Sequence, residues 1–329
     1  MSRFTDEGNH PVKPSIFKIF LIFLLALLVT PCFRAFAETL TVRDIKGAKG
    51  IFLQPGDSWL AKEEEYWLRL FQKLRDLHID TLFLQWSAEN GRVYADLELE
   101  NHEPRPLLEK IFRAARESGI KVFLGLYHET TYWRQIPGPP DVVENFFYLR
   151  AAANERLLAR WHEKFGQETA LAGYYIPDEI DDLNWRTPDR IGFYNLYLKL
   201  MVERIRKYDP ERPVAVSGFF RSRTAPRIFA ENLFAILKDT GINLLLIQDG
   251  AGEDNPSEAY RALYFEKIKE HKPEGIELAG ILEIFSRTSR ENEPFSAIPA
   301  PRERILRQLT EARKYFDSLG VFSLEYLEP

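Results

Sequence analysis

The chain has 329 residues, of which 44 are Lys or Arg and 49 are Asp or Glu, for a net charge of -5. With 45% hydrophobic and 28% charged residues it has the composition of a folded globular protein, and its slight acidity argues against nucleic acid as a partner. A single cysteine, Cys32, excludes a disulfide framework and a cluster of thiolate metal ligands.

The first predicted element is a secretory signal peptide over residues 1–37. An apolar run from Ile16 to Val29 contains one charged residue, Lys18, and is followed by Ala35-Phe36-Ala37, a small-x-small cleavage site. The uncharged part of the run is short for a helix that spans a membrane. Cleavage leaves residues 38–329 as the mature chain, so we expect a secreted or periplasmic protein.

Two other interpretations of this segment stay open. An uncleaved segment would anchor the chain, and the long stretch before the apolar run favours this; it would be the chain's one contact with a membrane. A lipoprotein attached through Cys32 is less favoured, because Pro31 stands where a small residue is expected.

After Gly50, short apolar runs alternate with stretches of helical periodicity. The apolar runs lack strict polar alternation, which is typical of strands buried on both faces of a parallel sheet. They predict strands at 50–55, 81–86, 121–128, 171–177, 213–219, 243–248, 276–282 and 320–324. Helices are expected between them, near 63–77, 106–118, 141–165, 189–207, 227–239, 257–270 and 302–317.

This alternation predicts an α/β protein with one domain over residues 38–329, a (β/α)8 TIM barrel. A doubly wound open sheet is the alternative, although the strands are numerous for that fold. No Gly-x-Gly-x-x-Gly follows the first strand and no Walker sequence occurs, so we expect no cofactor.

Polar and aromatic residues follow nearly every predicted strand. In a barrel these positions meet at the C-terminal face, where active sites form. In chain order the candidates for substrate binding are Gln54, Gln85, Trp86, Tyr127, His128, Trp133, Asp178, Trp185, Gln248, Asp249 and Glu325. His128 is the single histidine among them, so we expect no metal site.

Two glutamates carry the functional hypothesis. Glu179 and Glu283 follow the fourth and seventh strands, which lie on roughly opposite sides of an eight-stranded ring. Glycosidic cleavage needs two opposed carboxyl groups, of which one donates a proton and the other attacks or stabilises the anomeric carbon. The structural alternative for either residue is a salt bridge with an arginine at the rim.

Tryptophans near the strand ends favour a sugar site, because pyranose rings stack on flat indole surfaces. Rings that plug the barrel or pack its loops are the alternative. The rim candidates are Trp59, Trp86, Trp133 and Trp185, together with Tyr132. Trp67 and Trp161 fall in predicted helices and are expected in the core.

The segments Gly173-Tyr-Tyr-Ile-Pro-Asp-Glu179, with Ile180-Asp-Asp182, and Gln248-Asp-Gly250 resemble motifs of a bacterial family of glycoside-hydrolase-like barrels, filed as a domain of unknown function. The whole layout resembles the clan of (β/α)8 glycoside hydrolases whose acid/base follows strand four and whose nucleophile follows strand seven. That resemblance implies that Glu179 is the acid/base and Glu283 the nucleophile. The clan usually has Asn before the acid/base, where it binds a sugar hydroxyl. Here the residue is Asp178, which when ionised accepts hydrogen bonds but cannot donate one.

We therefore expect an exported glycoside hydrolase that cleaves a polysaccharide or oligosaccharide with retention. For this mechanism the two carboxyl groups should lie roughly 5–5.5 Å apart, with Glu179 protonated near neutrality and Glu283 charged. A non-catalytic glycan-binding barrel, favoured by Asp178, and another hydrolase or lyase using the same carboxylates stay open. If an arginine held Glu283, Glu325 would be the next candidate.

Overall fold

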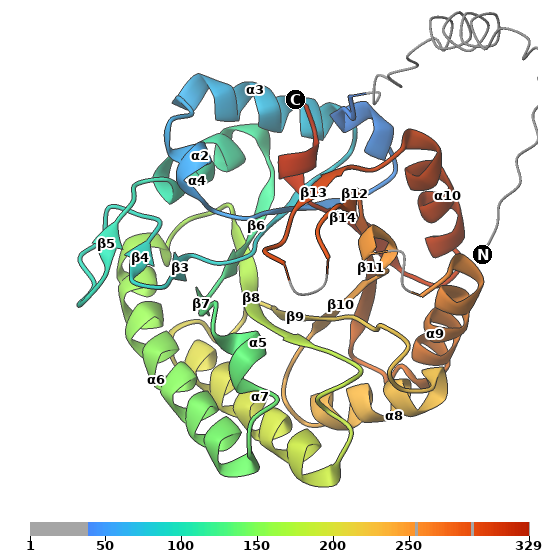
Figure 1. Ribbon diagram of the computed structural model, residues 1–329. Helices are drawn as coiled ribbons and strands as arrows, with labels where there is room; N and C mark the ends of the chain where they lie inside the picture. The colour runs from blue at the N-terminus through green and yellow to red at the C-terminus, as the bar shows by residue number, and fades with distance from the viewer. Residues whose placement is uncertain (1–38, 254–255, 291–292, 329) are drawn as a thin grey trace, which may run out of the picture. The chain divides into compact units, whose positions relative to one another are not determined.

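A closed barrel of parallel strands lies at the centre of the fold, and helices surround it (Figure 1). The structure is a computed structural model that describes residues 39–253, 256–290 and 293–328. In these residues the barrel order is β1 (Gly50–Leu53), β2 (Thr81–Leu84), β6 (Lys121–Gly125), β8 (Leu171–Ile180), β9 (Val214–Gly218), β10 (Leu244–Gln248), β11 (Glu277–Glu283) and β14 (Ser318–Phe322). Because β14 pairs with β1, the sheet has no edge. The predicted barrel is confirmed, and the open sheet is excluded.

The helices cover the outside of the barrel, close to their predicted ranges. They are α3 (Glu64–Asp76), α4 (Leu108–Ser118), α6 (Pro140–Phe165), α7 (Pro188–Tyr208), α8 (Pro226–Leu237), α9 (Glu258–His271) and α10 (Arg302–Ala312). Proline opens α6, α7 and α8, where its missing N–H costs no helical hydrogen bond. No helix of the described ranges is long and apolar enough to cross a membrane. The predicted signal peptide lies outside those ranges.

Short elements supplement the barrel; η1 precedes β1, and most of the others follow barrel strands. One of them, β7, is the end of the predicted strand 121–128, whereas the sequence pattern did not indicate the others as separate elements. A small sheet joins β3 (Ala88–Glu89), β4 (Arg92–Val93), β5 (Glu103–Pro104) and β7 (Tyr127–His128). The others include η1 (Val42–Ile45), α2 (Asp57–Leu60), α5 (Tyr132–Gln135), η2 (Ala251–Glu253), the hairpin of β12 (Phe285–Arg287) and β13 (Ala297–Pro299), and η3 (Leu324–Tyr326). At two to four residues each, they are too short to show a hydrophobic period.

Strand β8 is longer than predicted and shifts its register near the end. Ile176 pairs with Val216 of β9, whereas Ile180 pairs with Gly218, so β8 has two extra residues in this interval. Such an irregularity changes where the following side chains point. The interval contains Asp178 and Glu179.

Aromatic rings fill the inside of the barrel. Phe52, Phe83 and Phe123 come from neighbouring strands, and each successive pair has ring centroids 5.0 Å apart. Tyr175 of β8 meets Phe52 edge-on at 5.4 Å. These rings belong to a separate interior core, so the barrel is packed and does not form a pore.

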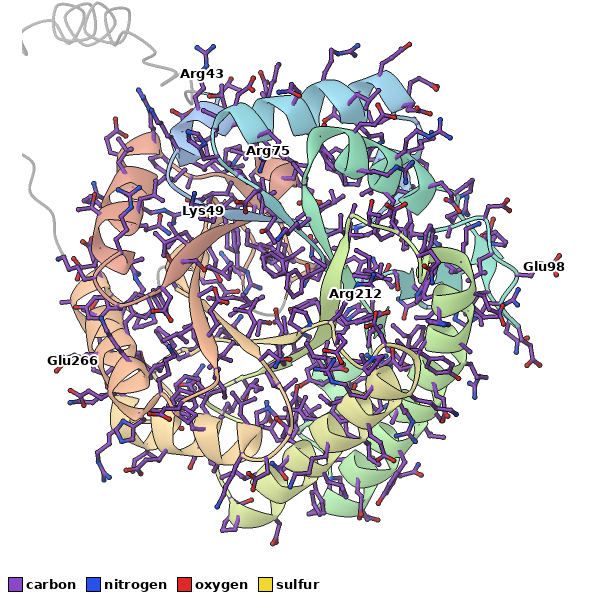
Figure 2. All side chains as sticks on the ribbon, turned by 180° about the vertical axis from the view of Figure 1, so that it is seen from behind. Arg43, Lys49, Arg75, Glu98, Arg212 and Glu266 are labelled. Carbon is purple, nitrogen blue, oxygen red and sulfur yellow. The ribbon has the colours of Figure 1, made fainter. Side chains whose placement is uncertain are left out.

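A second core lies between the strands and the helices, and it buries Trp67 and Trp161 completely, as predicted. Figure 2 shows the molecule from behind, where Lys49 and Arg212 mark the end at which strands begin. Arg212 pairs with Asp209 and donates from Nε to the carbonyl oxygen of Leu171 at 2.8 Å. These contacts hold the starts of β8 and β9.

Gly125 of β6 packs directly against the backbone at the end of β2. A Cβ at this position would lie 2.2 Å from the carbonyl oxygen of Leu84. We predict that Gly125→Ala lowers the free energy of unfolding by about 3 kcal/mol, because the backbone of β2 must move. Urea unfolding measures the effect.

Gly192 provides the matched control for this substitution. It lies in α7, and a Cβ there meets nothing within 4 Å. Gly192→Ala should therefore be stabilising by about 0.5–1 kcal/mol, through helix propensity. Equal effects of the two substitutions would contradict the packing argument.

Candidate active site

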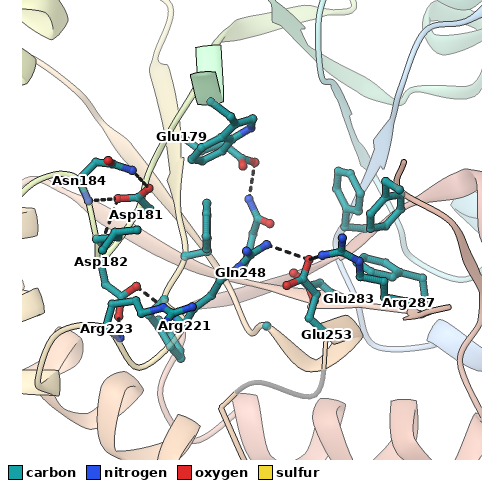
Figure 3. A pocket seen from close by; sticks show the side chains of 18 of the residues that line it. Glu179, Asp181, Asp182, Asn184, Arg221, Arg223, Gln248, Glu253, Glu283 and Arg287 are labelled. Carbon is teal, nitrogen blue, oxygen red and sulfur yellow. Dashed lines mark hydrogen bonds and ion pairs between the residues drawn. The ribbon is translucent and has the colours of Figure 1, made fainter. Parts of the chain in front are cut away.

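A cavity of about 570 Å³ opens at the end of the barrel where the strands finish, and Figure 3 shows side chains that line it. Six residues selected from the sequence line this cavity: Gln54, Gln85, Trp133, Glu179, Gln248 and Glu283. Each of them lies at or shortly after the end of a barrel strand. The structure therefore brings both glutamates into one cavity.

Glu179 is held by hydrogen bonds from neighbouring strands. Nε2 of Gln248 donates to Glu179 Oε1 at 2.5 Å, and Ser217 Oγ lies 3.5 Å from the same oxygen. The Tyr132 hydroxyl fixes the main chain by donating to the Glu179 carbonyl oxygen at 2.7 Å. Burial raises the pKa of Glu179 to about 7, against the Gln248 and Ser217 hydrogen bonds and the charge of Arg221, which lower it. Such a group can both donate and accept a proton near neutral pH.

Glu283 lies at the end of β11 and is buried more deeply. Its Oε2 accepts the backbone N–H of Gly252 at 2.7 Å. A Cβ on Gly252 would lie 2.8 Å from this oxygen, so glycine permits the approach. Burial, followed by the charge of Asp249, raises the pKa of Glu283 to about 8.

Asp249 lies behind Glu283 and is buried outside the cavity, contrary to its predicted role in substrate binding. Its Oδ1 accepts the backbone N–H of Glu283 at 3.1 Å, and its Oδ2 accepts Nε2 of Gln308 at 2.6 Å. Gln308 also donates to the Glu283 carbonyl oxygen at 3.2 Å. Asp249 therefore supports Glu283 and does not reach a bound ligand.

The ionisation of the two glutamates differs from the expectation that Glu283 stays charged while Glu179 keeps its proton. Both pKa values are raised, because both carboxyl groups are removed from water and each charge disfavours another nearby. Within the described ranges neither glutamate forms an ion pair with Lys or Arg. The alternative interpretation, in which each glutamate forms a salt bridge with an arginine at the rim, therefore does not describe these residues.

Asp178 is fully buried and faces the helices. The prediction that it binds substrate is therefore wrong. It forms an ion pair with Arg150 of α6, with Nη2 at 2.8 and 3.0 Å from its two oxygens. The hydroxyl of Tyr197 also donates to this carboxylate, and that of Tyr194 donates to the Asp178 carbonyl oxygen. Because neighbouring strand residues face opposite sides, the alternation that points Glu179 into the cavity turns Asp178 away.

Only part of the predicted aromatic rim lines the cavity. Trp133 is 41% exposed and contributes to the wall. Trp59, Trp86, Tyr132 and Trp185 are buried instead, as the packing alternative expected. Trp185, only 1% exposed, packs against Phe147 and Tyr194 between the long helices, so it cannot stack on a sugar.

Three further predicted residues lie outside the cavity lining. His128 stacks on Trp86 with ring centroids 4.9 Å apart, and burial lowers the pKa of His128 to about 4. Tyr127 lies beside it under the guanidinium of Arg150. Glu325 accepts the backbone N–H of Gln54 at 2.8 Å and so positions a cavity residue without lining the wall.

Several cavity residues that the sequence pattern did not indicate follow β8, β9, β10 and β11, and Phe322 ends β14. The first group includes Asp181, Asp182, Asn184, Phe219, Arg221, Arg223, Glu253, Phe285, Arg287 and Phe295. A search extended by two to four residues beyond each strand end would have found Arg221 and Phe285. Asp182 is buried and accepts the backbone N–H groups of Arg221 and Arg223 at 2.9 and 2.6 Å.

In the part of the chain that the structure describes, no three His, Cys, Asp or Glu side chains are grouped so that they could hold a metal ion. The lining instead combines two carboxyl groups with raised pKa values, amide side chains and aromatic rings. This set suits proton transfer and nucleophilic attack on a ligand with hydroxyl groups.

A family model described as "Domain of unknown function (DUF4434)" matches residues 48–328. The chain belongs to this family. It is also 27% identical over 310 residues to "Uncharacterized protein YbcH" of Escherichia coli strain K12, which covers 94% of this chain and 96% of that protein.

Solved structures similar to this chain include proteins named as glycoside hydrolases. A proposed alpha-L-fucosidase from Bacteroides thetaiotaomicron matches with a TM-score of 0.64 and 16% identity, over 84% of this chain and 88% of that one. The intracellular xylanase TsXylA of Thermoanaerobacterium saccharolyticum matches with a TM-score of 0.51 and 14% identity, over 86% and 88%. At these identities the similarity establishes the TIM-barrel fold, and neither an activity nor a substrate.

The buried pair of Asp178 and Arg150 generates a stability prediction. Asp178→Ala should lower the free energy of unfolding by about 3–5 kcal/mol, because it leaves the Arg150 guanidinium buried without a counter-charge. Urea unfolding at pH 7 measures the loss. Glu163→Ala, which breaks the exposed pair with Arg160, should cost less than about 1 kcal/mol.

The double variant Asp178→Leu with Arg150→Met separates charge from packing. It should recover most of the lost stability, since replacing both members of a buried pair by apolar residues is often nearly neutral. An Asp178→Ala variant as stable as Glu163→Ala would contradict the account.

Proposed function

We propose that this protein is an exported glycoside hydrolase that cleaves a polysaccharide or oligosaccharide with retention at the anomeric carbon. The observation that carries the proposal is the placement of Glu179 and Glu283 in one cavity, on different barrel strands, where neither forms an ion pair with a Lys or Arg of the described ranges. A carboxylate that served only stability would be paired or fully solvated.

Glu179 acts as the acid/base. Its pKa of about 7 lets it carry a proton for the leaving glycosidic oxygen and remove one from water in the second step. Gln248 restricts the position of the carboxyl group by donating to Oε1, which leaves the other oxygen for the ligand.

Glu283 acts as the nucleophile. The Gly252 N–H stabilises its ionised form, while Asp249 and Gln308 hold its main chain. Because its carboxylate is removed from water, little hydration has to be lost before it attacks. The covalent intermediate removes the negative charge of Glu283, which lowers the pKa of Glu179. Having given its proton to the leaving oxygen, Glu179 therefore stays ionised and accepts a proton from the attacking water in the next step.

A glycan-binding barrel without turnover is the second candidate. Its sequence support was Asp178 in place of a sugar-binding asparagine. Since Asp178 is buried against Arg150, this difference removes no contact from the cavity wall. Another hydrolase or lyase that uses the same carboxylates would be detected by the same variants.

The test incubates the protein with bacterial and plant polysaccharides and measures turnover as the release of reducing ends. Glu283→Gln should abolish release, and Glu179→Gln should lower kcat by roughly 10²–10⁴-fold, most strongly for poor leaving groups. Azide should rescue Glu179→Gln through a glycosyl azide, because azide attacks the intermediate without needing a base. Glu163→Gln, at an exposed position on α6, is the control. Release unaffected by either cavity variant would refute the assignment.

The raised pKa values predict an unusual pH profile. Activity requires Glu283 ionised and Glu179 protonated, so kcat/KM should be bell-shaped. Since burial raises the two pKa values to about 7 and about 8, the maximum should lie near neutral pH, above the range of ordinary carboxyl groups. Below this range both carboxyl groups are protonated, and above it both are ionised. Because the pKa of Glu283 is the higher of the two, the active form, with the proton on Glu179, is the minor singly protonated form.

Gln248→Leu tests the cause of the profile. It removes a hydrogen bond that lowers the pKa of Glu179, so the limb governed by Glu179 should move to higher pH. Gln72→Leu, on the exposed surface of α3, should leave the profile unchanged. A maximum between pH 4 and 5, unmoved by Gln248→Leu, would contradict the prediction.

A further inference from the structure

Two arginines in the cavity wall share one carboxylate oxygen. Arg221, which follows β9, lies with Nη2 2.8 Å from Glu253 Oε1, and Arg287, which ends β12, lies with Nη1 3.0 Å from the same oxygen. Figure 3 shows the three side chains around the same hollow, near Gln248. Among the described residues, two guanidinium groups thus share a single carboxylate oxygen.

Aromatic rings hold both guanidinium groups in place. The Arg221 Cζ lies 5.4 Å from the ring centre of Phe219, and the Arg287 Cζ lies 5.7 Å from that of Phe295. Arg287 Nη2 also donates to the carbonyl oxygen of Arg290 at 2.9 Å. Stacked and hydrogen-bonded guanidinium groups lose little entropy when they bind an anion.

The other carboxylates near this cluster are already engaged. Asp182 accepts backbone N–H groups of the loop after β9, and Asp181 accepts those of Leu183 and Asn184 at 3.0 and 2.6 Å. Glu179 and Glu283 are the proposed catalytic pair, which holds a proton in its active form. Among the described residues none of these four carboxyl groups forms an ion pair with Arg221 or Arg287, and Glu253 is the carboxylate that the two guanidinium groups share.

We propose that the substrate is an acidic glycan, and that Arg221 and Arg287 bind the carboxylate of a hexuronic acid residue beside the catalytic pair; this rests on the proposed function. The planar guanidinium group forms paired hydrogen bonds with a carboxylate, which a compact ammonium group cannot do. The faces of Phe219 and Phe295 next to the arginines provide apolar surface for the pyranose ring. A site that offers guanidinium groups to a carboxylate and an aromatic face to a pyranose ring matches a uronic acid better than a neutral sugar.

The cavity also continues along the loop after β8. A second hollow of about 330 Å³ shares Pro137, Leu183 and Asn184 with it and adds Arg186 and Arg190 to the wall. Arg190 donates to the carbonyl oxygens of Ile136 and Gly138, both at 2.6 Å, whereas Arg186 is exposed. Further arginines along the same path suit an acidic chain that extends beyond one sugar.

The experiment measures binding of glycans to the purified Glu179→Gln chain, so that turnover does not interfere. Polygalacturonate, alginate and hyaluronan oligosaccharides are compared with their carboxyl-reduced forms, which keep the ring and lose the charge. At least one acidic oligosaccharide should bind tenfold or more tightly than its reduced form. Rising salt should weaken only the acidic ligand's binding.

Arginine variants locate the effect. Arg287→Gln should weaken binding of the acidic ligand at least tenfold and that of the reduced ligand less than twofold. Arg221→Lys keeps the charge but loses the planar fork, and should also weaken acidic binding. Arg227→Gln, on the exposed face of α8, is the matched control and should have no effect.

The outcomes separate this inference from the proposed function. Equal binding of acidic and reduced forms, or a preference for sulfated glycans over every uronate, would overturn the carboxylate site. If neutral glycans are then cleaved by the unsubstituted chain, the hydrolase proposal stands alone. Tight, arginine-dependent binding of an acidic glycan that the unsubstituted chain never cleaves would support this site and refute the hydrolase.

Discussion

The opposite orientation of two neighbouring residues, Asp178 and Glu179, is the constraint on which the site depends. Successive side chains of a strand face opposite sides, so when one carboxylate enters the cavity the other must enter the helix layer. A carboxylate in that layer is stable only with a counter-charge, which Arg150 provides. The hydroxyl groups of Tyr132 and Tyr194 then fix the carbonyl oxygens of both residues. Residues of α5, α6 and α7 thereby help to determine where Glu179 lies.

Desolvation has a different role at the two ends of the cavity. At Glu179 and Glu283 burial is the largest effect and raises the pKa of each carboxyl group. At Glu253, two guanidinium groups contact the carboxylate directly. The same residue type therefore lies in two different electrostatic environments of one cavity. The difference is direct contact, because among the described residues no arginine forms an ion pair with Glu179 or Glu283.

The fold could be predicted because each barrel strand is an apolar run and each helix has its own period. Glu179, Glu283, Gln54, Gln85, Gln248 and Trp133 could be placed at the cavity because they follow such runs. Asp178, Asp249 and Trp185 could not be excluded, because position after a strand does not reveal which side a residue faces once the register of β8 shifts. Arg221, Glu253 and Arg287 come together only through loop conformations, which have no periodic pattern in the sequence.

The aspartate at position 178 can now be explained by packing. With asparagine there, the Arg150 guanidinium would be buried without a counter-charge, and its Nε and Nη1 atoms already have no hydrogen-bond partner within the described chain. Such an arginine would cost several kcal/mol, far more than the few tenths that separate most exposed substitutions. Positions 150 and 178 therefore constrain each other: a chain with asparagine at 178 needs a neutral side chain at 150. The departure from the glycoside hydrolase pattern thus reflects a buried ion pair behind the site, and leaves the wall that meets the ligand unchanged.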